Sequence, residues 1–150
     1  MSLFEKDKKS DDYTIIVGCG RLGANLANTL SDIGRKVTII DLNTDAFRKL
    51  SPSFGGIVTT GNATDLHVLE DADIEKATSV VSVTNNDNTN IMVAQLAKEM
   101  YGVKQVVARL YEKERDCVYQ ELGISTISPA VLSEHEVDRL LGLSTQEHRV

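Results

Sequence analysis

The segment from Tyr13 to Gly23 constrains the possible fold more than any other part of the chain. Residues 14–17 are a β-branched run, Thr-Ile-Ile-Val, which predicts a buried strand. The strand leads directly into Gly-Cys-Gly-Arg-Leu-Gly at residues 18–23, a G-x-G-x-x-G loop. Apolar residues at helical spacing follow as far as Ile33. A strand, a glycine loop and an amphipathic helix in this order predict a β–α unit with the loop at the helix N-terminus.

Each glycine of the loop has a separate expected task. Gly18 permits the tight turn, Gly20 lets the backbone approach a pyrophosphate, and Gly23 lets the helix pack closely on the strand. The free N–H groups of the first helical turn and the helix dipole would then face a phosphate. The loop therefore predicts nucleotide binding, and the alternative is a tight β–α turn with no ligand.

Asp41 follows a second predicted strand at residues 36–40, about 20 residues after the glycines. An acid at this position accepts hydrogen bonds from ribose hydroxyls and repels a 2′-phosphate, so NADP is disfavoured. It does not separate NAD from AMP, ADP or ATP, because all of them carry an adenosine ribose. The alternative role of Asp41 is to cap the next helix.

The remaining chain alternates between strand and helix patterns. We expect further strands at 57–60, 79–83, 105–110 and 124–127, and helices at 44–50, 66–74, 91–100, 112–122 and 130–141. This alternation predicts an α/β fold, a Rossmann-like doubly wound parallel sheet with strand order 3-2-1-4-5-6 and a terminal helix. The expected organisation is a flexible arm at 1–12, one nucleotide-binding domain at 13–141 and a polar tail at 142–150.

Composition excludes several classes of protein. The net charge is -6 and there is no basic stripe, which argues against nucleic-acid binding. No apolar run approaches the roughly 20 residues of a membrane span, and the charged N-terminus is unlike a signal peptide, so we expect a cytoplasmic protein. The two cysteines, Cys19 and Cys117, lack metal-ligand spacing, so no metal site is expected. Cys19 lies at a helix N-terminus, which could lower its thiol pKa, although a small residue that fits the turn is the simpler interpretation.

The expected ligand site lies beyond the carboxyl ends of the strands, between the first and fourth strands. The glycine loop, the second-strand acid and the residues that follow the third and fourth strands meet there, and Arg21 could pair with a phosphate. The candidate nucleotide contacts are Gly18, Cys19, Gly20, Arg21, Leu22, Gly23, Asp41, Leu42, Asn62, Ala63, Thr84, Asn85 and Arg109.

Catalysis has little support in the sequence. Neither Tyr101 nor Tyr111 is followed by lysine in a Tyr-x-x-x-Lys pair, and no nucleophile–base or metal-ligand arrangement is evident, so no catalytic residue is assigned. We also expect no second domain that would supply a substrate pocket. A regulatory role is therefore favoured over an enzyme, and the alternative is a small NAD-dependent oxidoreductase or an NAD(H) redox sensor.

Several motifs together resemble those of RCK (TrkA-N) domains. Ile15–Gly23 is similar to the family's G-x-G-R-x-G signature, and Thr59–Asp65 to its Gly-Asp-Ala-Thr block. The turn at Thr84–Asn88 resembles its Thr-x-x-Asp-x-Asn pattern, and Val107–Arg109 its fifth-strand end. Leu122–Pro129 resembles the start of the family's crossover helix. The resemblance extends over residues 13–141.

The resemblance implies a cytoplasmic regulatory subunit of a Trk/Ktr-type potassium channel or transporter. Such subunits form rings, typically octamers of dimer units, beneath a membrane pore, and so lie peripheral to the inner membrane through their partner. Binding of an adenine nucleotide (AMP, ADP or ATP) or of NAD(H) changes the ring and gates potassium flow. By resemblance, the nucleotide contacts would include Gly18, Gly20, Arg21, Gly23, Asp41 and Arg109. The last helix would contact a second copy, with packing on its own sheet as the alternative.

Two positions depart from the family pattern. Asn62 stands where the family often has Asp, which keeps an acceptor for adenine but removes a charge. Ala130 stands where some members carry an acid that helps to hold a divalent ion, so a metal-bridged triphosphate is in doubt. The resemblance does not extend to the C-terminal lobe of many members, so we expect that lobe on another chain or a different partner surface.

Overall fold

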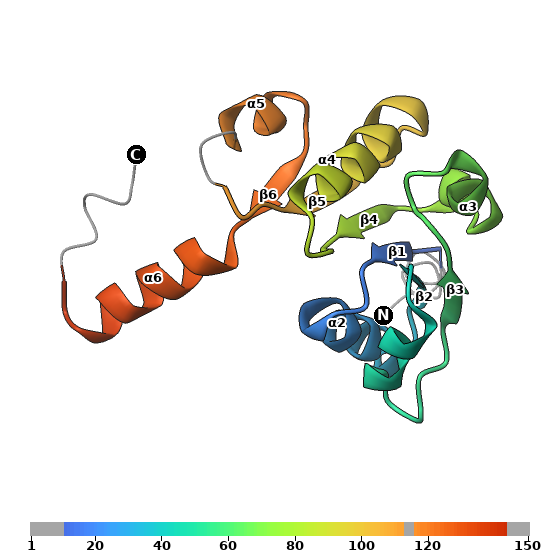
Figure 1. Ribbon diagram of the computed structural model, residues 1–150, viewed down its shortest axis with the longest axis horizontal. Coiled ribbons are helices and arrows are strands. Elements are labelled where there is room, and N and C mark those ends of the chain that lie inside the picture. The colour runs from blue at the N-terminus through green and yellow to red at the C-terminus, as the bar shows by residue number, and fades with distance from the viewer. Residues whose placement is uncertain (1–10, 113–115, 144–150) are drawn as a thin grey trace, which may run out of the picture.

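The computed structural model describes residues 11–112 and 116–143, and its centre is a parallel six-stranded sheet. The expected order is confirmed: the strands follow one another as β3-β2-β1-β4-β5-β6 (Figure 1). The predicted arm and tail fall largely on residues 1–10 and 144–150, which lie outside the described part. The strands are β1 (Tyr13–Val17), β2 (Lys36–Asp41), β3 (Ile57–Thr60), β4 (Ser79–Ser82), β5 (Gln105–Arg109) and β6 (Ser125–Ile127).

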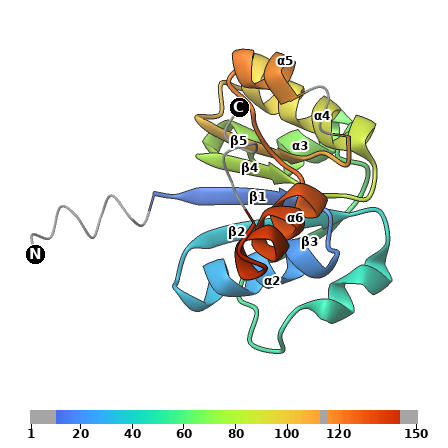
Figure 2. The same ribbon diagram turned by 90° about the vertical axis from the view of Figure 1, so that its left-hand side faces the viewer.

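Helices cover both faces of the sheet. In Figure 2, α4 and α5 lie above the strands and α2 lies below them. The elements between the strands are α2 (Arg21–Asp32), a 3-10 helix η1 (Thr44–Lys49), α3 (Leu66–Asp71), a short 3-10 turn η2 (Ile74–Lys76), α4 (Asp87–Gln95) with its π-helical continuation η3 (Leu96–Met100), and α5 (Asp116–Glu121). The chain then continues through β6 into α6 (Pro129–Leu140).

The core is split into two layers by the sheet, as the period of two along a strand requires. Ile15 and Val17 of β1 belong to the cluster under α3 and α4, whereas Ile16 belongs to the cluster under α2. Strand β1 lies in the middle and pairs with both β2 and β4. The strand order reverses between β1 and β4, and at this point both strands are held by hydrogen-bonded neighbours on each side.

Helix α4 begins four residues earlier than expected. We predicted a turn at 84–88 and a helix from Ile91, but the helix starts at Asp87. The cause is Asn86, whose side chain accepts a hydrogen bond from the Thr89 N–H at 2.9 Å and so caps the helix. The predicted helix at 112–122 is described from Asp116, and its residues 113–115 lie outside the described part.

Helix α6 projects away from the sheet (Figure 1). None of its residues is buried, and Leu132, Val137 and Leu140 are more than half exposed. The alternative that the last helix packs on its own sheet is therefore wrong. Among the described residues, no helix has the length and apolar character needed to cross a membrane.

Candidate functional site

A crevice of about 650 Å³ lies at the carboxyl ends of β1, β2, β3 and β4. This volume is within the range of cofactor and small-molecule sites, and the position is the one at which parallel sheets bind ligands. Its walls come from the glycine loop, the end of β2, η1, the segment after β3 and the segment after β4.

The three glycines of the loop differ in what surrounds them. Gly18 has a φ of +105°, and a Cβ there would lie 2.8 Å from the Thr84 backbone nitrogen. A Cβ on Gly23 would lie 1.9 Å from the Gly18 carbonyl oxygen. A Cβ on Gly20, by contrast, would meet no protein atom within 4 Å. The fold itself therefore requires Gly18 and Gly23, while Gly20 leaves open space beside the backbone.

The N-terminus of α2 opens onto this space. Gly20 is the N-cap residue, no side chain caps the helix, and the first turn contains no acid. The first N–H groups of an α-helix have no partner within the helix, and its dipole places partial positive charge there. The loop thus offers hydrogen-bond donors and a favourable potential to a phosphate without a competing carboxylate.

Asp41, at the end of β2, is held firmly beside the loop. Its Oδ2 accepts a hydrogen bond from the Cys19 N–H at 2.7 Å, and its Oδ1 accepts one from the Asn43 N–H at 2.8 Å. A carboxylate has about four lone-pair sites, so two remain for ribose hydroxyls. The expected alternative, Asp41 as a helix cap, is wrong because Asn43 caps η1.

Two further polar side chains, those of Asn62 and Lys49, line the crevice. Asn62 Oδ1 accepts hydrogen bonds from the N–H and the hydroxyl of Thr64, at 3.0 and 2.7 Å. This arrangement leaves the Asn62 amide nitrogen as the group that remains available to a ligand. Lys49 extends from η1, and its Nζ donates a hydrogen bond of 3.4 Å to the Cys19 carbonyl. We did not predict a role for Lys49. Residues three positions apart share a face of a 3-10 helix, so Ala46 and Lys49 of η1 both line the crevice.

The structure brings together most of the predicted contacts. Arg21, Leu22 and Gly23 lie in the first turn of α2 and do not line the crevice, and Arg21 is exposed to solvent. Arg109 lines an adjoining cavity instead. The predicted residues that line the crevice are Gly18, Cys19, Gly20, Asp41, Leu42, Asn62, Ala63, Thr84 and Asn85.

Asn90 is a fully buried polar residue that we did not predict. Its Oδ1 accepts hydrogen bonds from the Thr84 N–H and hydroxyl, at 2.8 and 2.6 Å, and from the Ser82 hydroxyl at 3.3 Å. Its Nδ2 donates to the carbonyls of Thr84 and Arg109, at 3.0 and 2.9 Å. Asn90 thus joins the ends of β4 and β5 and fixes Thr84 in the crevice wall. One signal for this role was present in the sequence: Asn90 directly precedes the apolar Ile91 in α4, so a polar side chain stands next to the buried face of the helix.

The Cys19 thiol is unsuited to nucleophilic chemistry. The side chain is buried and its Sγ donates a hydrogen bond to the Ala46 carbonyl at 3.3 Å. Burial, and then the nearby Asp41 carboxylate, raise the pKa of this thiol. The direction is opposite to the lowered pKa that a helix N-terminus alone would give, and the interpretation of Cys19 as a small residue that fits the turn is favoured.

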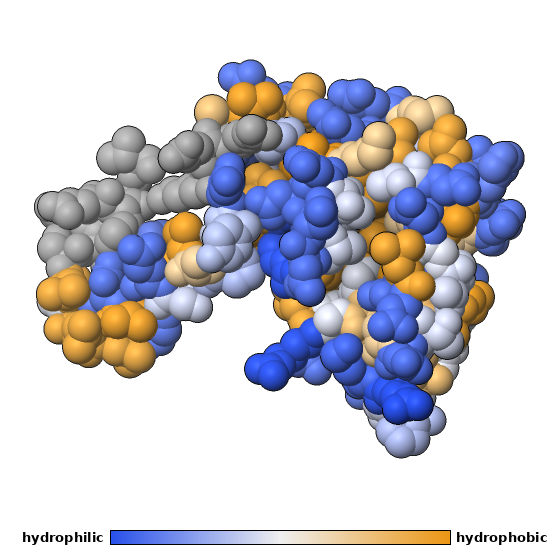
Figure 3. Space-filling model, in the orientation of Figure 1, coloured by the Kyte–Doolittle hydropathy of each residue, from blue (hydrophilic) through white to orange (hydrophobic). Residues whose placement is uncertain are grey.

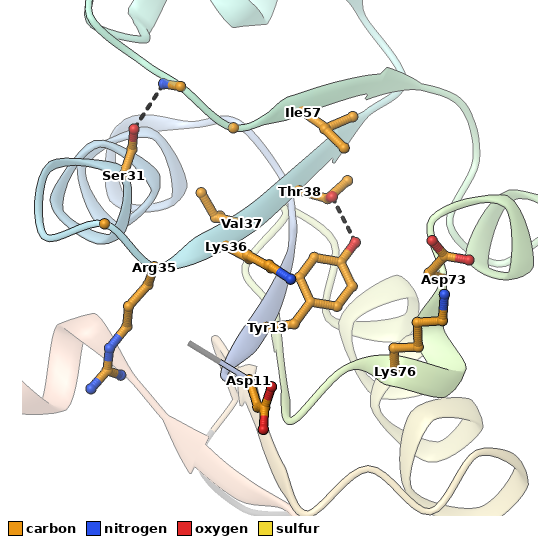
Figure 4. A pocket seen from close by; sticks show the side chains of 13 residues that line it. Asp11, Tyr13, Ser31, Arg35, Lys36, Val37, Thr38, Ile57, Asp73 and Lys76 are labelled. Carbon is orange, nitrogen blue, oxygen red and sulfur yellow. Dashed lines mark hydrogen bonds between the residues drawn. The ribbon is translucent and has the colours of Figure 1, made fainter. Parts of the chain in front are cut away.

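A second hollow of about 630 Å³ lies at the opposite, amino edge of the sheet (Figure 4). The Tyr13 ring stands at its centre, and its hydroxyl is hydrogen-bonded to the Thr38 hydroxyl at 2.6 Å and donates to the Ala72 carbonyl. Burial raises the pKa of Tyr13. The polar tip of this residue is already satisfied, and ligands of parallel sheets bind at the other edge. We therefore assign the candidate site to the crevice.

Comparison with known proteins identifies the family. A model of the TrkA-N domain matches residues 14–129. The Trk system potassium uptake protein TrkA of Streptomyces coelicolor is 44% identical over 116 residues, which cover 77% of this chain and 52% of that protein. A TrkA homolog of Pyrococcus abyssi is 34% identical over 110 residues, covering 73% of this chain and 48% of the homolog. The chain thus spans about half the length of these relatives.

Solved structures support the same fold. The TrkA-N domain of the inner membrane protein ybaL from Escherichia coli aligns with a TM-score of 0.76 at 18% identity, over 87% of this chain and 96% of that one. GsuK bound to ADP aligns with a TM-score of 0.73 at 26% identity, over 89% of this chain and 34% of that one. The AMP-bound Shewanella denitrificans Kef C-terminal domain aligns with a TM-score of 0.69 at 26% identity, over 89% of this chain and 84% of that one. The GsuK channel bound to NAD aligns with a TM-score of 0.73 at 26% identity, over 87% of this chain and 23% of that one.

The glycine loop, the acid at the end of β2 and the strand order agree with a family match that extends from β1 to the start of α6. The chain belongs to the TrkA-N domain family.

Proposed function

We propose that this chain is the nucleotide-binding, regulatory part of a potassium uptake system. One observation carries the proposal: the uncapped N-terminus of α2 opens onto a crevice in which Gly20 leaves space for a ligand. The relatives named as Trk potassium uptake proteins supply the physiological setting. The protein would act in the cytoplasm, held at the inner membrane by a channel or transporter partner.

The ligand we propose is an adenine nucleotide or NAD(H). Asp41 offers two free lone-pair sites to a ribose, and its negative charge disfavours the 2′-phosphate of NADP. Solved structures of similar proteins support this choice, because GsuK binds ADP and NAD and the Kef C-terminal domain binds AMP. The ligand regulates by binding one ring conformation more tightly than another, since it shifts an equilibrium only by its differential affinity.

Assembly into a ring, with octamers built from dimers, is proposed from the apolar surface of α6. Figure 3 shows hydrophobic side chains gathered at the far end of this helix. Leu140 is 69% exposed and Leu141 is 68% exposed. On the α2 side of the sheet, Val81 and Val107 of β4 and β5 line an open hollow. We propose that α6 of one copy packs into the hollow beside β4 and β5 of another copy. A reciprocal arrangement of the two helices would bury both apolar surfaces.

Gly20→Val is expected to lower nucleotide affinity by at least about 100-fold and to leave the protein folded. A Cβ at this position meets no protein atom within 4 Å, and the extended backbone at Gly20 (φ -84°, ψ -165°) suits a β-branched residue. It would fill the space needed by the pyrophosphate beside the α2 N-terminus. Calorimetric titration with AMP, ADP, ATP, NAD and NADH measures the change, and circular dichroism checks the fold. Unchanged binding by a folded variant would contradict the site.

The same titrations separate regulation from catalysis. A regulatory subunit binds its nucleotide tightly, forms an assembly larger than a dimer by light scattering, and does not turn over NADH with carbonyl compounds. Robust NADH oxidation across a panel of such compounds would instead establish the oxidoreductase alternative.

Leu140→Glu is expected to shift the assembly toward monomers, whereas Leu140→Met is expected to leave it intact. The glutamate places a charge within the exposed apolar surface of α6, while methionine keeps its apolar character and approximate volume. Because residue 140 is exposed in the single chain, both variants should keep the secondary structure of the wild type by circular dichroism. Light scattering over a concentration series reports the mass. A wild-type mass for Leu140→Glu would exclude α6 as the contact.

A further inference from the structure

The hollow around Tyr13 at the amino edge of the sheet is nearly as large as the crevice, about 630 Å³ against about 650 Å³. The two spaces share no lining residue. Gly55 and Gly56, which precede β3, bring no side chain into the hollow, and a Cβ on Gly56 would lie 2.5 Å from the Val37 carbonyl oxygen. The fold therefore keeps open a second space of small-molecule size, which the proposed nucleotide site does not include.

The strand register sets an aromatic ring, a cation and an apolar side chain next to one another in this hollow. Tyr13 of β1 pairs with Lys36 of β2, and Thr38 of β2 pairs with Ile57 of β3. Paired residues, and residues two apart along a strand, have their side chains on the same face of the sheet. The four side chains therefore share one face. Ile57 is 63% exposed, so the described residues leave much of its apolar surface uncovered.

Tyr13 offers its ring to the hollow rather than its hydroxyl. The hydroxyl is hydrogen-bonded to the Thr38 hydroxyl at 2.6 Å and donates to the Ala72 carbonyl, which brings the tip of the ring beside the next residue, Asp73. Burial, and in addition the Asp73 carboxylate, raise the pKa of Tyr13, so the phenol is uncharged at neutral pH. The face of a neutral aromatic ring attracts a cation.

Unpaired charges of both signs surround this ring. In the view of Figure 4, Lys36 lies to the left of the Tyr13 ring, Asp73 and Lys76 lie to its right, and Asp11 lies below it. Within residues 11–112 and 116–143, none of these four charged groups has a hydrogen-bond or salt-bridge partner. A ligand with one charge would face two groups of like sign, whereas a ligand with both charges can face the opposite sign at each end.

We infer that the hollow binds a small zwitterion, a molecule that carries a protonated or quaternary amine and a carboxylate. Its cationic nitrogen packs on the Tyr13 ring near Asp73, its carboxylate is bound by the Lys36 ammonium, and its carbon atoms contact Ile57. Quaternary ammonium groups are the cations for which aromatic rings are best suited. The charged side chains are exposed to solvent, so each contact is weak and we expect millimolar affinity. This site is additional to the proposed function and does not depend on nucleotide binding.

Three probes of similar size test the class of ligand. Glycine betaine carries both charges, 3,3-dimethylbutyrate replaces its cationic nitrogen with carbon, and choline replaces its carboxylate with a hydroxymethyl group. Saturation-transfer NMR on the full chain measures the dissociation constant of each probe. We expect betaine to bind and the other two to bind at least about fivefold more weakly. Equal affinity for betaine and either of the others would overturn the assignment to a zwitterion, and no binding of betaine would overturn the site.

Substitutions test the position of the site. Lys36→Gln and Asp73→Asn each remove one charge and should weaken betaine binding about three- to fivefold. Asparagine suits the left-handed backbone of residue 73, which has a φ of 58°. Lys104→Gln and Asp71→Asn, which remove exposed charges outside the hollow, are the matched controls and should bind as the wild type does. Wild-type affinity in both Lys36→Gln and Asp73→Asn would overturn the inference.

Two further comparisons separate a binding role from a structural one. Tyr13→Phe keeps the ring and should retain betaine affinity, whereas Tyr13→Leu should lose it, with circular dichroism as the check on folding. Gly20→Val, which fills the crevice, should bind betaine as the wild type does. Loss of betaine binding in Gly20→Val would place the zwitterion in the crevice, and equal affinity in Tyr13→Phe and Tyr13→Leu would exclude the ring; either result overturns the inference.

Discussion

Gly23→Ala is expected to destabilise the protein by about 3 kcal/mol, the upper end of the usual cost of overpacking. The added Cβ would lie 1.9 Å from the Gly18 carbonyl oxygen. That oxygen cannot easily retreat, because the Gly18 N–H donates a hydrogen bond of 2.8 Å to the Ile40 carbonyl. Relief requires α2 to move off β1, which would open the contacts of the buried residues Ala24 and Ala27. A lower midpoint of urea unfolding with an unchanged slope would report this loss.

Gly20→Ala is the matched control, since it adds the same methyl group three residues earlier. No protein atom lies within 4 Å of that Cβ, so its effect on the free energy of unfolding should stay within about 1 kcal/mol, the range of an N-cap substitution. Equal losses of stability in the two variants would contradict the close approach of α2 to the loop.

The fold was predictable because its signals are local. Each strand of the central sheet is a short run rich in β-branched residues, and the capping residues Asn43, Asp65 and Asn86 act within a few positions of their own helices. The strand order follows once right-handed crossovers are assumed. Asn86 is an exception. The run of Asn and Asp after β4 predicts a turn, but the Asn86 side chain caps α4, which therefore begins at Asp87.

The crevice was predictable where the backbone alone determines position. Gly18, Asp41 and Asn62 follow the ends of strands, and parallel strands bring those ends to one edge of the sheet. Side chains that reach across elements were not predictable. The Arg109 guanidinium turns toward Thr84 and Asn85 and so lines a neighbouring cavity, and Lys49 reaches the loop from η1. Their directions depend on contacts between residues more than 20 positions apart.

The position of α6 shows a different limit. Its apolar residues at helical spacing are compatible with packing on its own sheet or on another copy, and the periodicity of a helix does not name its partner. Only the arrangement after β6, in which α6 leaves the sheet, separates these possibilities. The same departure carries Ser128, at the start of α6, into the lining of the cavity that adjoins the crevice.

Asn90→Ala is expected to lower the free energy of unfolding by about 3–5 kcal/mol, more than an exposed Asn→Ala change in the same helix, because it leaves several buried groups without partners. The N–H of Thr84 and the carbonyl of Arg109 both lose the hydrogen bonds that join β4 to β5. Asn88→Ala is the matched control, since Asn88 is exposed two residues earlier in α4.

Denaturant unfolding of the two variants measures this difference, and nucleotide titration adds a functional readout. Thr84 lines the crevice, and its backbone nitrogen lies against Gly18. Loss of Asn90 should therefore loosen one wall of the site and weaken nucleotide binding even in the fraction of protein that remains folded. Similar stability of Asn90→Ala and Asn88→Ala would show that the buried amide does not hold the strands together. Lost stability with undiminished affinity would show that the glycine loop and Asp41 form the site without help from Thr84.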